Sequence, residues 1–376
     1  MNVIRDLVCG IALLLCLSTG AIAESVDVWV GTTTPRNGLS KGIYHLSFDA
    51  DKGKLSPSKL AAEISNPGFL AIDVSAKRLY STGTVDGKPS VAAFEINGDR
   101  LKMLNSEPIG DGGAAHVSVN TEARFLLTAQ YGGGSVAVFP LKDDGSIGAR
   151  SQLIDHEGGS KVVARRQDSS HAHWTGFDQN KKFAFVPDLG LDAVVIYKVD
   201  AAKRSISPHG RGLVPPGGGP RHMKFHPNGK LAYVLNELAL SITVFDYDPG
   251  AGAMKPIQTV QTLTDEQKSK ETFNSASEIR VHKSGRFVYS ANRGHDSITV
   301  FRVDSSTGRL TKVEDEPIRG GWPRNFNIDP SGKWVLAAGR DSNTLTVFSI
   351  DEDTGELTYN RGVSFVPSPI CVEFGE

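Results

Sequence analysis

The stretch PRHMKFHPNGKLAYVLNELALSITVF, residues 220–245, contains three short segments with strand character. Its first part alternates like an inner strand, Pro227-Asn228-Gly229-Lys230 has turn composition, and Leu231–Leu235 returns as a second strand. A third segment, Ser241–Phe245, ends in an aromatic residue. This order predicts consecutive strands of one antiparallel sheet.

The same unit recurs along the whole chain. Related turn phrases occur at Val281–Phe287 and at Ile328–Trp334. The aromatic residues that end the third strands are Phe48, Phe94, Phe139, Tyr197, Phe245, Phe301 and Phe348. Their intervals of 46, 45, 58, 48, 56 and 47 residues match the period of a four-stranded propeller blade. We therefore predict an all-β fold, a seven-bladed β-propeller over residues 24–376.

One blade is predicted to be shared by the two ends of the chain. Pro369–Phe374 resembles an inner strand, but too little chain follows it to complete a blade. Val26–Val30 and Gly42–Phe48 resemble second and third strands that lack a first. Their pairing would close the ring and remove exposed sheet edges. Two units are longer than the rest, and their extra polar residues, about 150–170 and 261–275, are predicted to form loops over one face.

Residues 1–23 have the pattern of an export signal. Arg5 precedes the apolar run Val8–Leu17, and Ala21-Ile22-Ala23 has the small-x-small pattern of a cleavage site. We therefore expect a periplasmic or secreted protein that has no membrane contact after cleavage. Cleavage would leave Cys371 as the remaining cysteine, so no internal disulfide is expected.

The charge balance limits the possible partners. The formal net charge of the 376-residue chain is −1, which provides no basic field for nucleic acid or anionic membranes. We expect a monomer that binds a small molecule.

Aligning the units by their inner strands predicts which residues meet. The position of Arg221 corresponds in the other units to Gly68, Ala115, His173, Ser277, Arg324 and Ile370. Three second strands end at Asn236-Glu237, Asn292-Arg293 and Gly339-Arg340. The start of one strand and the end of its antiparallel neighbour share one edge of a sheet. These side chains are therefore predicted to gather at one mouth of the ring.

The gathered residue types suit an anionic substrate. Arginine binds carboxylate or phosphate through two parallel hydrogen bonds, and Glu or His can transfer protons. Two other interpretations remain open. The charges could link blades in a non-catalytic binding propeller. A metal could bind His171, His173 and either His222 or a carboxylate, but no convincing third ligand is present, so we predict neither a metal nor another cofactor.

The motifs also resemble a known family. Gly219–Asn228 followed by Val234–Leu238 closely resembles the propeller-type 6-phosphogluconolactonases, a family that includes the fungal carboxy-cis,cis-muconate cyclases. Ser170–His173 resembles its His-x-His segment, Ala291–Arg293 its Asn-Arg segment, and Pro323-Arg324 a second Pro-Arg.

The resemblance implies a set of functional residues. Glu237, Arg221, Arg293 and His173 or His171 are implied as catalytic or substrate-binding groups. The full set of expected site residues comprises the catalytic Glu237, His173, Arg221 and Arg293 and the substrate-binding His171, Arg324, Asn236, Asn292 and Arg340.

The implied activity is metal-independent hydrolysis of a small anionic or sugar lactone. Glu237 would deprotonate the attacking water, Arg221 and Arg293 would stabilise the oxyanion or hold a carboxylate, and His173 would protonate the leaving alkoxide. The alternative is ring closure of an unsaturated acid by the same groups. The export signal departs from the cytoplasmic sugar-phosphate enzymes, so the sequence leaves open whether the substrate is phosphorylated.

Overall fold

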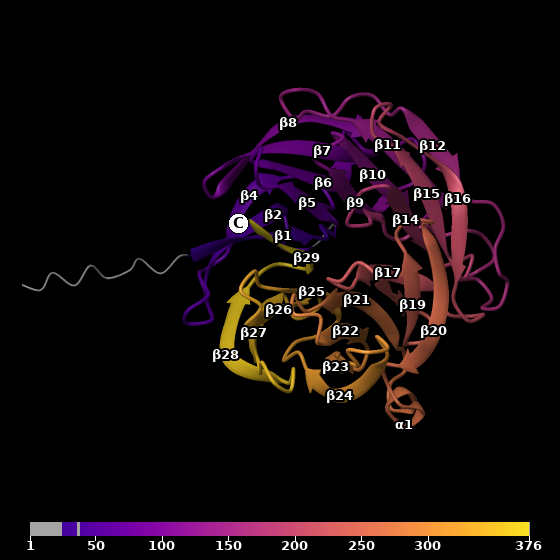
Figure 1. Ribbon diagram of the computed structural model, residues 1–376. Coiled ribbons are helices and arrows are strands. Elements are labelled where there is room, and N and C mark those ends of the chain that lie inside the picture. The colour runs from indigo at the N-terminus through magenta and orange to yellow at the C-terminus, as the bar shows by residue number, and fades with distance from the viewer. Residues whose placement is uncertain (1–24, 36–37, 376) are drawn as a thin grey trace, which may run out of the picture.

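The computed structural model describes residues 25–35 and 38–375, and it confirms the predicted seven-bladed β-propeller. Seven antiparallel sheets stand in a ring (Figure 1). The first strand of each sheet lies nearest the axis, where first strands of neighbouring sheets contact one another. The export signal expected at residues 1–23 lies outside the described residues.

The strands follow the chain around the ring. From the axis outward, the first sheet contains β29 (Pro369–Gly375), β1 (Ser25–Thr32) and β2 (Gly42–Asp49), with β3 (Lys54–Leu55) and β4 (Lys59–Glu63) both pairing with β2. The second contains β5 (Leu70–Asp73), β6 (Arg78–Val85), β7 (Lys88–Asn97) and β8 (Arg100–Pro108). The third contains β9 (Ala114–Asn120), β10 (Phe125–Gln130), β11 (Ser135–Pro140) and β12 (Gln152–Asp155). The fourth contains β13 (Gly176–Phe177), β14 (Phe183–Asp188), β15 (Ala193–Asp200) and β16 (Ser205–Leu213).

The remaining sheets complete the ring. The fifth contains β17 (Pro220–Phe225), β18 (Leu231–Asn236), β19 (Ser241–Asp248) and β20 (Ala253–Gln261). The sixth contains β21 (Ser275–Val281), β22 (Phe287–Arg293), β23 (Ser297–Val303) and β24 (Leu310–Pro317). The seventh contains β25 (Pro323–Ile328), β26 (Trp334–Gly339), β27 (Thr344–Ile350) and β28 (Leu357–Phe365).

The seven aromatic residues of the repeat pack between the sheets. Each lies in a third strand and is at most 1% exposed. Phe245 shares a buried cluster with Phe185 of the preceding sheet, as Phe301 does with Tyr233. Full burial of one such side chain contributes roughly 1.5–3 kcal/mol. The repeat therefore marks the positions that hold adjacent blades together.

The two ends of the chain share the first sheet, as predicted. β29 pairs antiparallel with β1, with Val28 opposite Phe374 and Val30 opposite Val372. Figure 1 shows the yellow β29 beside the indigo β1. This pairing gives β1 a neighbour on its axial side and closes the ring.

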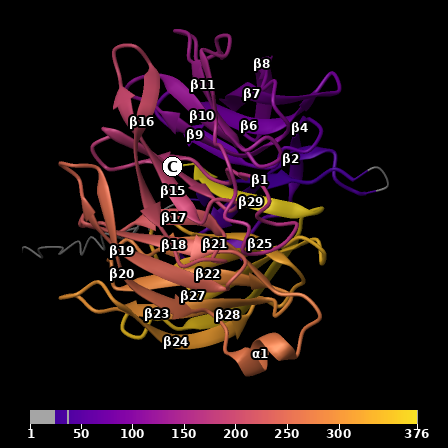
Figure 2. The same cartoon turned by 90° about the vertical axis from the view of Figure 1, so that its right-hand side faces the viewer.

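The long insertions differ from the expectation in one respect. Residues 261–275 were expected to be loop, but they contain the short helix α1 (Asp265–Ser269) at the periphery of the ring (Figures 1 and 2). A capping box stabilises this helix, because the side chains of Thr264 and Gln267 each accept a hydrogen bond from the other's backbone N–H. The insertion between β12 and β13 is irregular, as expected.

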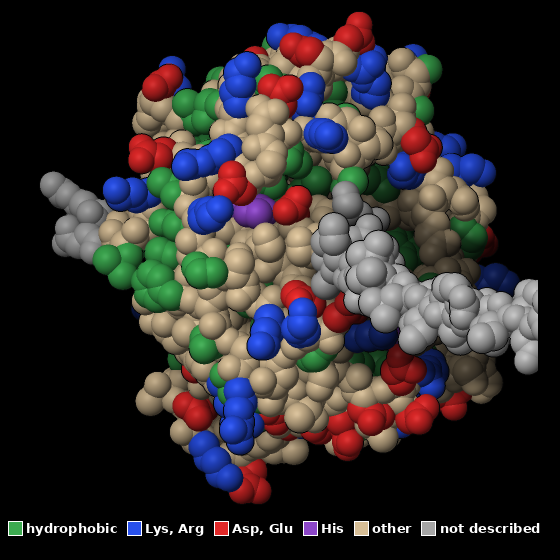
Figure 3. All heavy atoms as spheres, turned by 90° about the vertical axis from the view of Figure 1, so that its left-hand side faces the viewer, with side chains coloured by type: hydrophobic (Ala, Val, Ile, Leu, Met, Phe, Trp, Pro, Cys, Tyr) green, Lys and Arg blue, Asp and Glu red, His purple; other side chains and the backbone are tan. Residues whose placement is uncertain are grey.

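The surface carries mixed charge. On the side seen in Figure 3, acidic and basic side chains are interspersed, in keeping with the net charge of −1. Within residues 25–35 and 38–375, no helix has the length and apolar character needed to cross a membrane.

Removal of the closing strand tests the role of ring closure. Truncation after Ser368 deletes β29 and exposes the backbone edge of β1, so we expect insolubility or a Tm lowered by many degrees. Circular dichroism melting of the truncated chain against a control lacking residue 376 alone measures this effect. An unchanged melting curve would show that the pairing does not stabilise the ring.

Candidate active site

Bulges near the starts of the inner strands aim side chains toward one end of the axis. The register between β17 and β18 shifts at Arg221, and that between β25 and β26 shifts at Arg324. Three other inner strands shift at the aligned positions Ala115, Ser277 and Ile370. A bulge leaves one residue unpaired and redirects its side chain. The alignment of the repeats therefore corresponds to a shared backbone irregularity.

Glu237, directly after β18, is the centre of the cluster. Its Oε2 accepts a hydrogen bond from Arg221 Nη1 at 2.6 Å, and Nη2 of Arg293 at the end of β22 lies 3.3 Å from its Oε1. His173 Nε2 lies 3.8 Å from Oε2. The structure thus brings together Glu237, Arg221, Arg293 and His173 as the alignment predicted, while their chemical roles stay predictions.

These charges are removed from solvent. Glu237 is 4% exposed and Arg221 is 1% exposed. Burial alone would raise the pKa of Glu237, but the charges of Arg221 and Arg293, together with the hydrogen bond from Arg166, outweigh it and hold this pKa well below its usual value. Burial also lowers the pKa of Arg293, to about 10. Glu237 is therefore a carboxylate in this state.

His173 is held as a neutral hydrogen-bond donor. Burial, followed by the charge of Arg221, keeps its pKa well below the usual value. Arg221 Nη1 donates to its Nε2, so the proton of the neutral ring must lie on Nδ1. Within the described part of the chain, Nδ1 has no hydrogen-bond partner.

Other donors at the site are also free. Buried Arg221 Nη2 and Arg293 Nε lack hydrogen-bond partners among residues 25–35 and 38–375. Over the same residues, the guanidinium of Arg324 makes no hydrogen bond or ion pair, and its pKa is lowered well below its usual value by burial and by Arg221 and Arg293. Buried donors are normally paired, so the free nitrogens of Arg221 and Arg293, with the partly buried Arg324 beside them, are available to a bound ligand or water.

Arg166 and Tyr131 were not expected at the site. Arg166 Nη2 donates to Glu237 Oε1 at 2.7 Å and to the Tyr131 hydroxyl at 3.3 Å. Arg166 belongs to the insertion between β12 and β13. The extra length of this insertion was the one signal in the sequence that it could contribute to the site. The period of the repeat could not show which residue of an irregular insertion turns inward.

Buried hydrogen bonds hold this insertion and the histidine segment in place. His156 Nδ1 lies 2.7 Å from Asp188 Oδ2, and its Nε2 lies 2.7 Å from the Tyr197 hydroxyl. Asp188 Oδ1 also accepts the backbone N–H of His171. The side chain of Gln167, 0% exposed, donates to Leu189 O and to Asp192 Oδ1. The backbone on both sides of the cluster is therefore anchored.

Four other predicted site residues are more peripheral. His171 stacks on Tyr131 with ring centroids 4.6 Å apart, and the same aromatic ring meets His173 edge-on. Arg340 pairs with Asp341 and lies over the ring of Trp322. The side-chain amides of Asn236 and Asn292 donate to hydroxyl groups of their own blades: Ser241, Thr243, Ser297 and Thr299. Binding of substrate by these four residues stays a prediction.

An aromatic pair lies beside the cluster. Trp322 stacks on Phe273 of the second insertion, with ring centroids 5.5 Å apart, and the guanidinium of Arg293 lies 5.6 Å from the Trp322 ring. Phe273 is 48% exposed. Both insertions therefore contribute side chains near the arginines.

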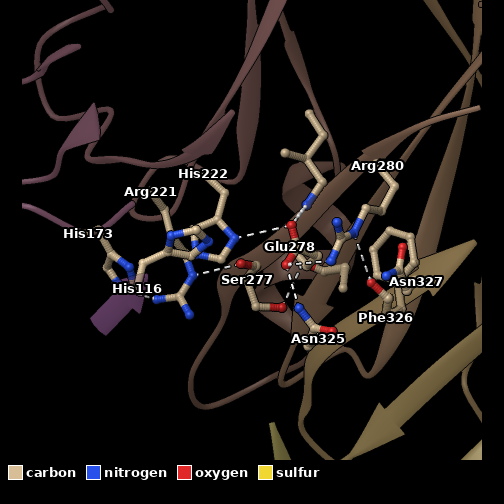
Figure 4. Close-up of polar contacts among 12 residues, drawn as sticks. His116, His173, Arg221, His222, Ser277, Glu278, Arg280, Asn325, Phe326 and Asn327 are labelled. Atoms are coloured by element: carbon tan, nitrogen blue, oxygen red, sulfur yellow. Dashed lines mark hydrogen bonds and ion pairs between the residues drawn. The ribbon is translucent and has the colours of Figure 1, made fainter. Parts of the chain in front are cut away.

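A second polar layer supports the cluster (Figure 4). Arg221 Nε donates to Ser277 O at 2.7 Å, which fixes the bulged arginine. The next residues along the inner strands, His222, Glu278 and Asn325, form a hydrogen-bonded row. Burial lowers the pKa of His222 to about 4, so this histidine is neutral near pH 7.

No metal ligand set is found in the described residues. Groups of three or more His, Cys, Asp or Glu side chains with metal-binding geometry do not occur among them. His171 Nδ1 lies 2.8 Å from Tyr131 O, and His173 is bound by Arg221. The two histidines therefore have separate partners.

Sequence comparison relates the chain to propeller lactonases. A family model described as "Lactonase, 7-bladed beta-propeller" matches residues 27–374. The chain is 38% identical over 348 residues to a 6-phosphogluconolactonase of Bacillus subtilis, with 92% of this chain and 97% of that protein covered.

Solved structures agree with this relationship. The chain is similar to a putative 6-phosphogluconolactonase of Bacteroides fragilis, with a TM-score of 0.86 and 30% identity over 94% of this chain and 98% of that one. It is also similar to a periplasmic gluconolactonase of Pseudomonas aeruginosa, with a TM-score of 0.82 and 29% identity over 93% of this chain and 99% of that one.

Neutralising Glu237 tests the charge balance of the cluster. Glu237→Gln leaves buried guanidinium groups without their carboxylate, and removal of one partner from a buried pair costs roughly 3–5 kcal/mol. We expect a lower Tm, and we expect millimolar sulfate to raise the Tm of this variant more than that of the wild type, because the anion replaces the lost charge.

Thermal melts with and without sulfate measure both effects. Glu122→Gln, which removes an exposed carboxylate paired with Lys181, is the matched control and should leave the Tm nearly unchanged. Equal sulfate responses in the wild type and Glu237→Gln would contradict the view that Glu237 balances the charge of these arginines.

Proposed function

Since the chain belongs to the seven-bladed β-propeller lactonase family and is a lactone-hydrolysing enzyme, we propose that its arginine cluster binds a small sugar lactone that carries an anionic group. The observation that carries this proposal is the charge imbalance at the site. Arg166, Arg221, Arg293 and Arg324 face one carboxylate, that of Glu237. These five groups together carry excess positive charge, and an anionic ligand would compensate part of it.

Arg324 is proposed to bind the fixed anionic group of the substrate. Its guanidinium is available because it makes no ion pair within the described residues, and burial together with the nearby charges of Arg221 and Arg293 lowers its pKa. A phosphate or carboxylate binds an arginine through two parallel, charge-assisted hydrogen bonds. A phosphorylated aldonolactone has both a lactone ring and an anionic group. The Bacillus relative is named for a substrate of this class.

Hydrolysis is proposed to occur at Glu237. The carboxylate takes a proton from water, the water oxygen bonds to the lactone carbonyl carbon, and the oxyanion that forms is stabilised by the free donors Arg221 Nη2 and Arg293 Nε. The ring C–O bond then breaks, and the protonated Glu237 returns its proton to the alkoxide.

For His173 we propose a role other than the acid expected from the sequence. Its low pKa leaves it neutral, so it supplies a hydrogen bond from Nδ1–H rather than a readily lost proton. We propose that this bond orients the lactone and polarises the oxygen that it contacts.

The protein is proposed to act as a monomer outside the cytoplasm. Residues 1–23 have the composition of a cleaved leader, and a similar protein of Pseudomonas aeruginosa is described as periplasmic. Cys371, which would remain after cleavage, is buried, and burial raises the pKa of its thiol well above the usual value. Such a thiol is a poor nucleophile for disulfide exchange.

A substrate panel tests the proposed specificity. Titration at constant pH should show that kcat/KM is higher for 6-phosphogluconolactone than for gluconolactone or a muconolactone. In Arg324→Gln, we expect KM for the phosphorylated lactone to rise roughly tenfold or more, because a charge-assisted pair is lost. The Tm should stay the same or rise, since the replaced cation has no partner within the described residues and lies near other arginines.

The control for this variant is Arg309→Gln, which removes an exposed arginine from the turn between β23 and β24. It should change neither KM nor Tm. Equal kcat/KM values for phosphorylated and plain lactones, unaltered by Arg324→Gln, would contradict an anionic substrate.

The proposed location has its own test. Expression of the full chain in a Gram-negative host should yield a periplasmic protein that begins at Glu24. Its mass and its N-terminal sequence measure this start. An uncleaved chain in the cytoplasmic fraction would contradict export.

A further inference from the structure

We propose that Arg166 changes partners when substrate binds: its guanidinium leaves Glu237 and pairs with the anionic group of the lactone, which frees Glu237 Oε1 for water. Arg166 is thereby a specificity-determining residue that couples recognition of the anion to activation of the base. The inference rests on the proposed function, because it concerns the same site.

The hydrogen bonds of Arg166 suit such an exchange. Its side chain is 33% exposed, whereas those of Arg221 and Arg293 are 1% and 6% exposed. Arg221 and Arg293 are also tied by hydrogen bonds to the backbone oxygens of Ser277 and Ala276. Arg166 instead donates to two side chains, Glu237 and Tyr131. Its guanidinium can therefore leave the carboxylate while the backbone hydrogen bonds that hold the other two arginines stay intact.

The backbone next to Arg166 does not need to move. Gln167 is fully buried and bound to Leu189 O and Asp192 Oδ1, and Ser160 N–H donates to Gly190 O. The insertion is therefore anchored on both sides of the arginine. Arg166 is the partly exposed member of its pair with Glu237, so rotation of its side chain alone can exchange the partner.

Catalysis requires the exchange because Glu237 is otherwise occupied. Its Oε1 is contacted by Arg166 and Arg293, and its Oε2 by Arg221, with His173 nearby. A carboxylate bound in this way binds protons weakly and is a poor general base. Departure of Arg166 removes one hydrogen bond and one positive charge. Arg221 from β17, Arg293 from β22, Arg324 from β25 and His173 before β13 still face the carboxylate, so its proton affinity is restored only in part.

The incoming anion keeps the number of ion pairs made by Arg166 unchanged. A phosphate or carboxylate takes the place of Glu237 as the partner of Arg166, so one ion pair replaces another. A lactone without an anionic group cannot do this. The structure therefore predicts that the resting enzyme is held in a state of low activity that anionic substrates relieve.

Arg166→Ala separates this role from a structural one. For the phosphorylated lactone, we expect kcat/KM to fall roughly tenfold or more, because a charge-assisted hydrogen bond to the substrate disappears. For gluconolactone, we expect kcat/KM to be kept or raised, because Glu237 is no longer covered. The acidic limb of the gluconolactone kcat/KM profile should move to higher pH, since this limb reports the free enzyme.

Arg165→Ala is the matched control. It removes the same charge from the neighbouring, exposed residue, whose side chain makes no hydrogen bond or ion pair within the described residues, and it should reproduce the wild-type profiles. Equal losses of kcat/KM for both lactones in Arg166→Ala, with an unmoved acidic limb, would overturn the exchange.

A binding measurement distinguishes failure of the exchange from failure of the proposed function. Calorimetry of sulfate binding in two buffers of different ionisation enthalpy, at about pH 5, counts the protons taken up, and sulfate itself does not titrate there. Wild type should take up more protons than Arg166→Ala, and Glu237→Gln should take up none at this site. Equal uptake by the wild type and Arg166→Ala would overturn the exchange.

The two readouts then separate the outcomes. A wild-type enzyme that hydrolyses no lactone of the panel but shows Arg166-dependent proton uptake would contradict the proposed function and support the exchange. An enzyme that prefers the phosphorylated lactone but loses activity equally on both substrates in Arg166→Ala would support the function and contradict the exchange.

Discussion

The carboxylate of Glu237 is shared by guanidinium groups from three separate parts of the chain, and the organisation of the site depends on this sharing. Arg221 reaches it from β17, Arg293 from β22 and Arg166 from the insertion before β13. Without the carboxylate, buried cations would repel one another at short range, and a buried charge that lacks its partner is strongly destabilising. Glu237 therefore holds the arginines in place before it acts in any reaction.

The propeller supplies the rigidity that such a cluster needs. Its inner strands are fixed by sheets on both sides, and the antiparallel pairing of β29 with β1 completes the ring. The bulges at Arg221 and Arg324 turn these side chains out of the regular pleat. Beneath them, the backbone oxygen of Ser277 and the row of His222, Glu278 and Asn325 leave Arg221 little freedom. Preorganised charges of this kind need little rearrangement when negative charge develops on a substrate.

The arginines and the neutral histidine of the site differ in charge, and they therefore suit different parts of a substrate. Arg324 and the free nitrogens of Arg221 and Arg293 are available to negative oxygen atoms, whereas His173 offers a neutral N–H donor. Arg166 is the more exposed member of the cluster, and it belongs to an insertion rather than to the repeat. Rigid strands thus carry the groups that stabilise charge, and the irregular segment carries the group that is free to respond to it.

Much of the fold and part of the site could be predicted from the sequence. The spacing of aromatic residues such as Phe245 and Phe301 determined the number of blades, because each blade needs one large apolar side chain at the same place in its third strand. The strand alternation and the unmatched ends determined the shared blade. The alignment of the repeats placed Arg221 with Glu237 and Arg293, since antiparallel pairing brings a strand start beside its neighbour's end.

Other features were decided only in three dimensions. Arg166, Tyr131 and the stacked pair of Phe273 and Trp322 reach the site through insertions or contacts between blades, which no period describes. Asn236 lies beside Glu237 in the chain, yet its amide donates to its own blade. The low pKa of His173 likewise follows from burial and from the position of Arg221. Local sequence determines which strands form and how they repeat, whereas burial, tautomer and charge balance depend on atoms brought together from distant parts of the ring.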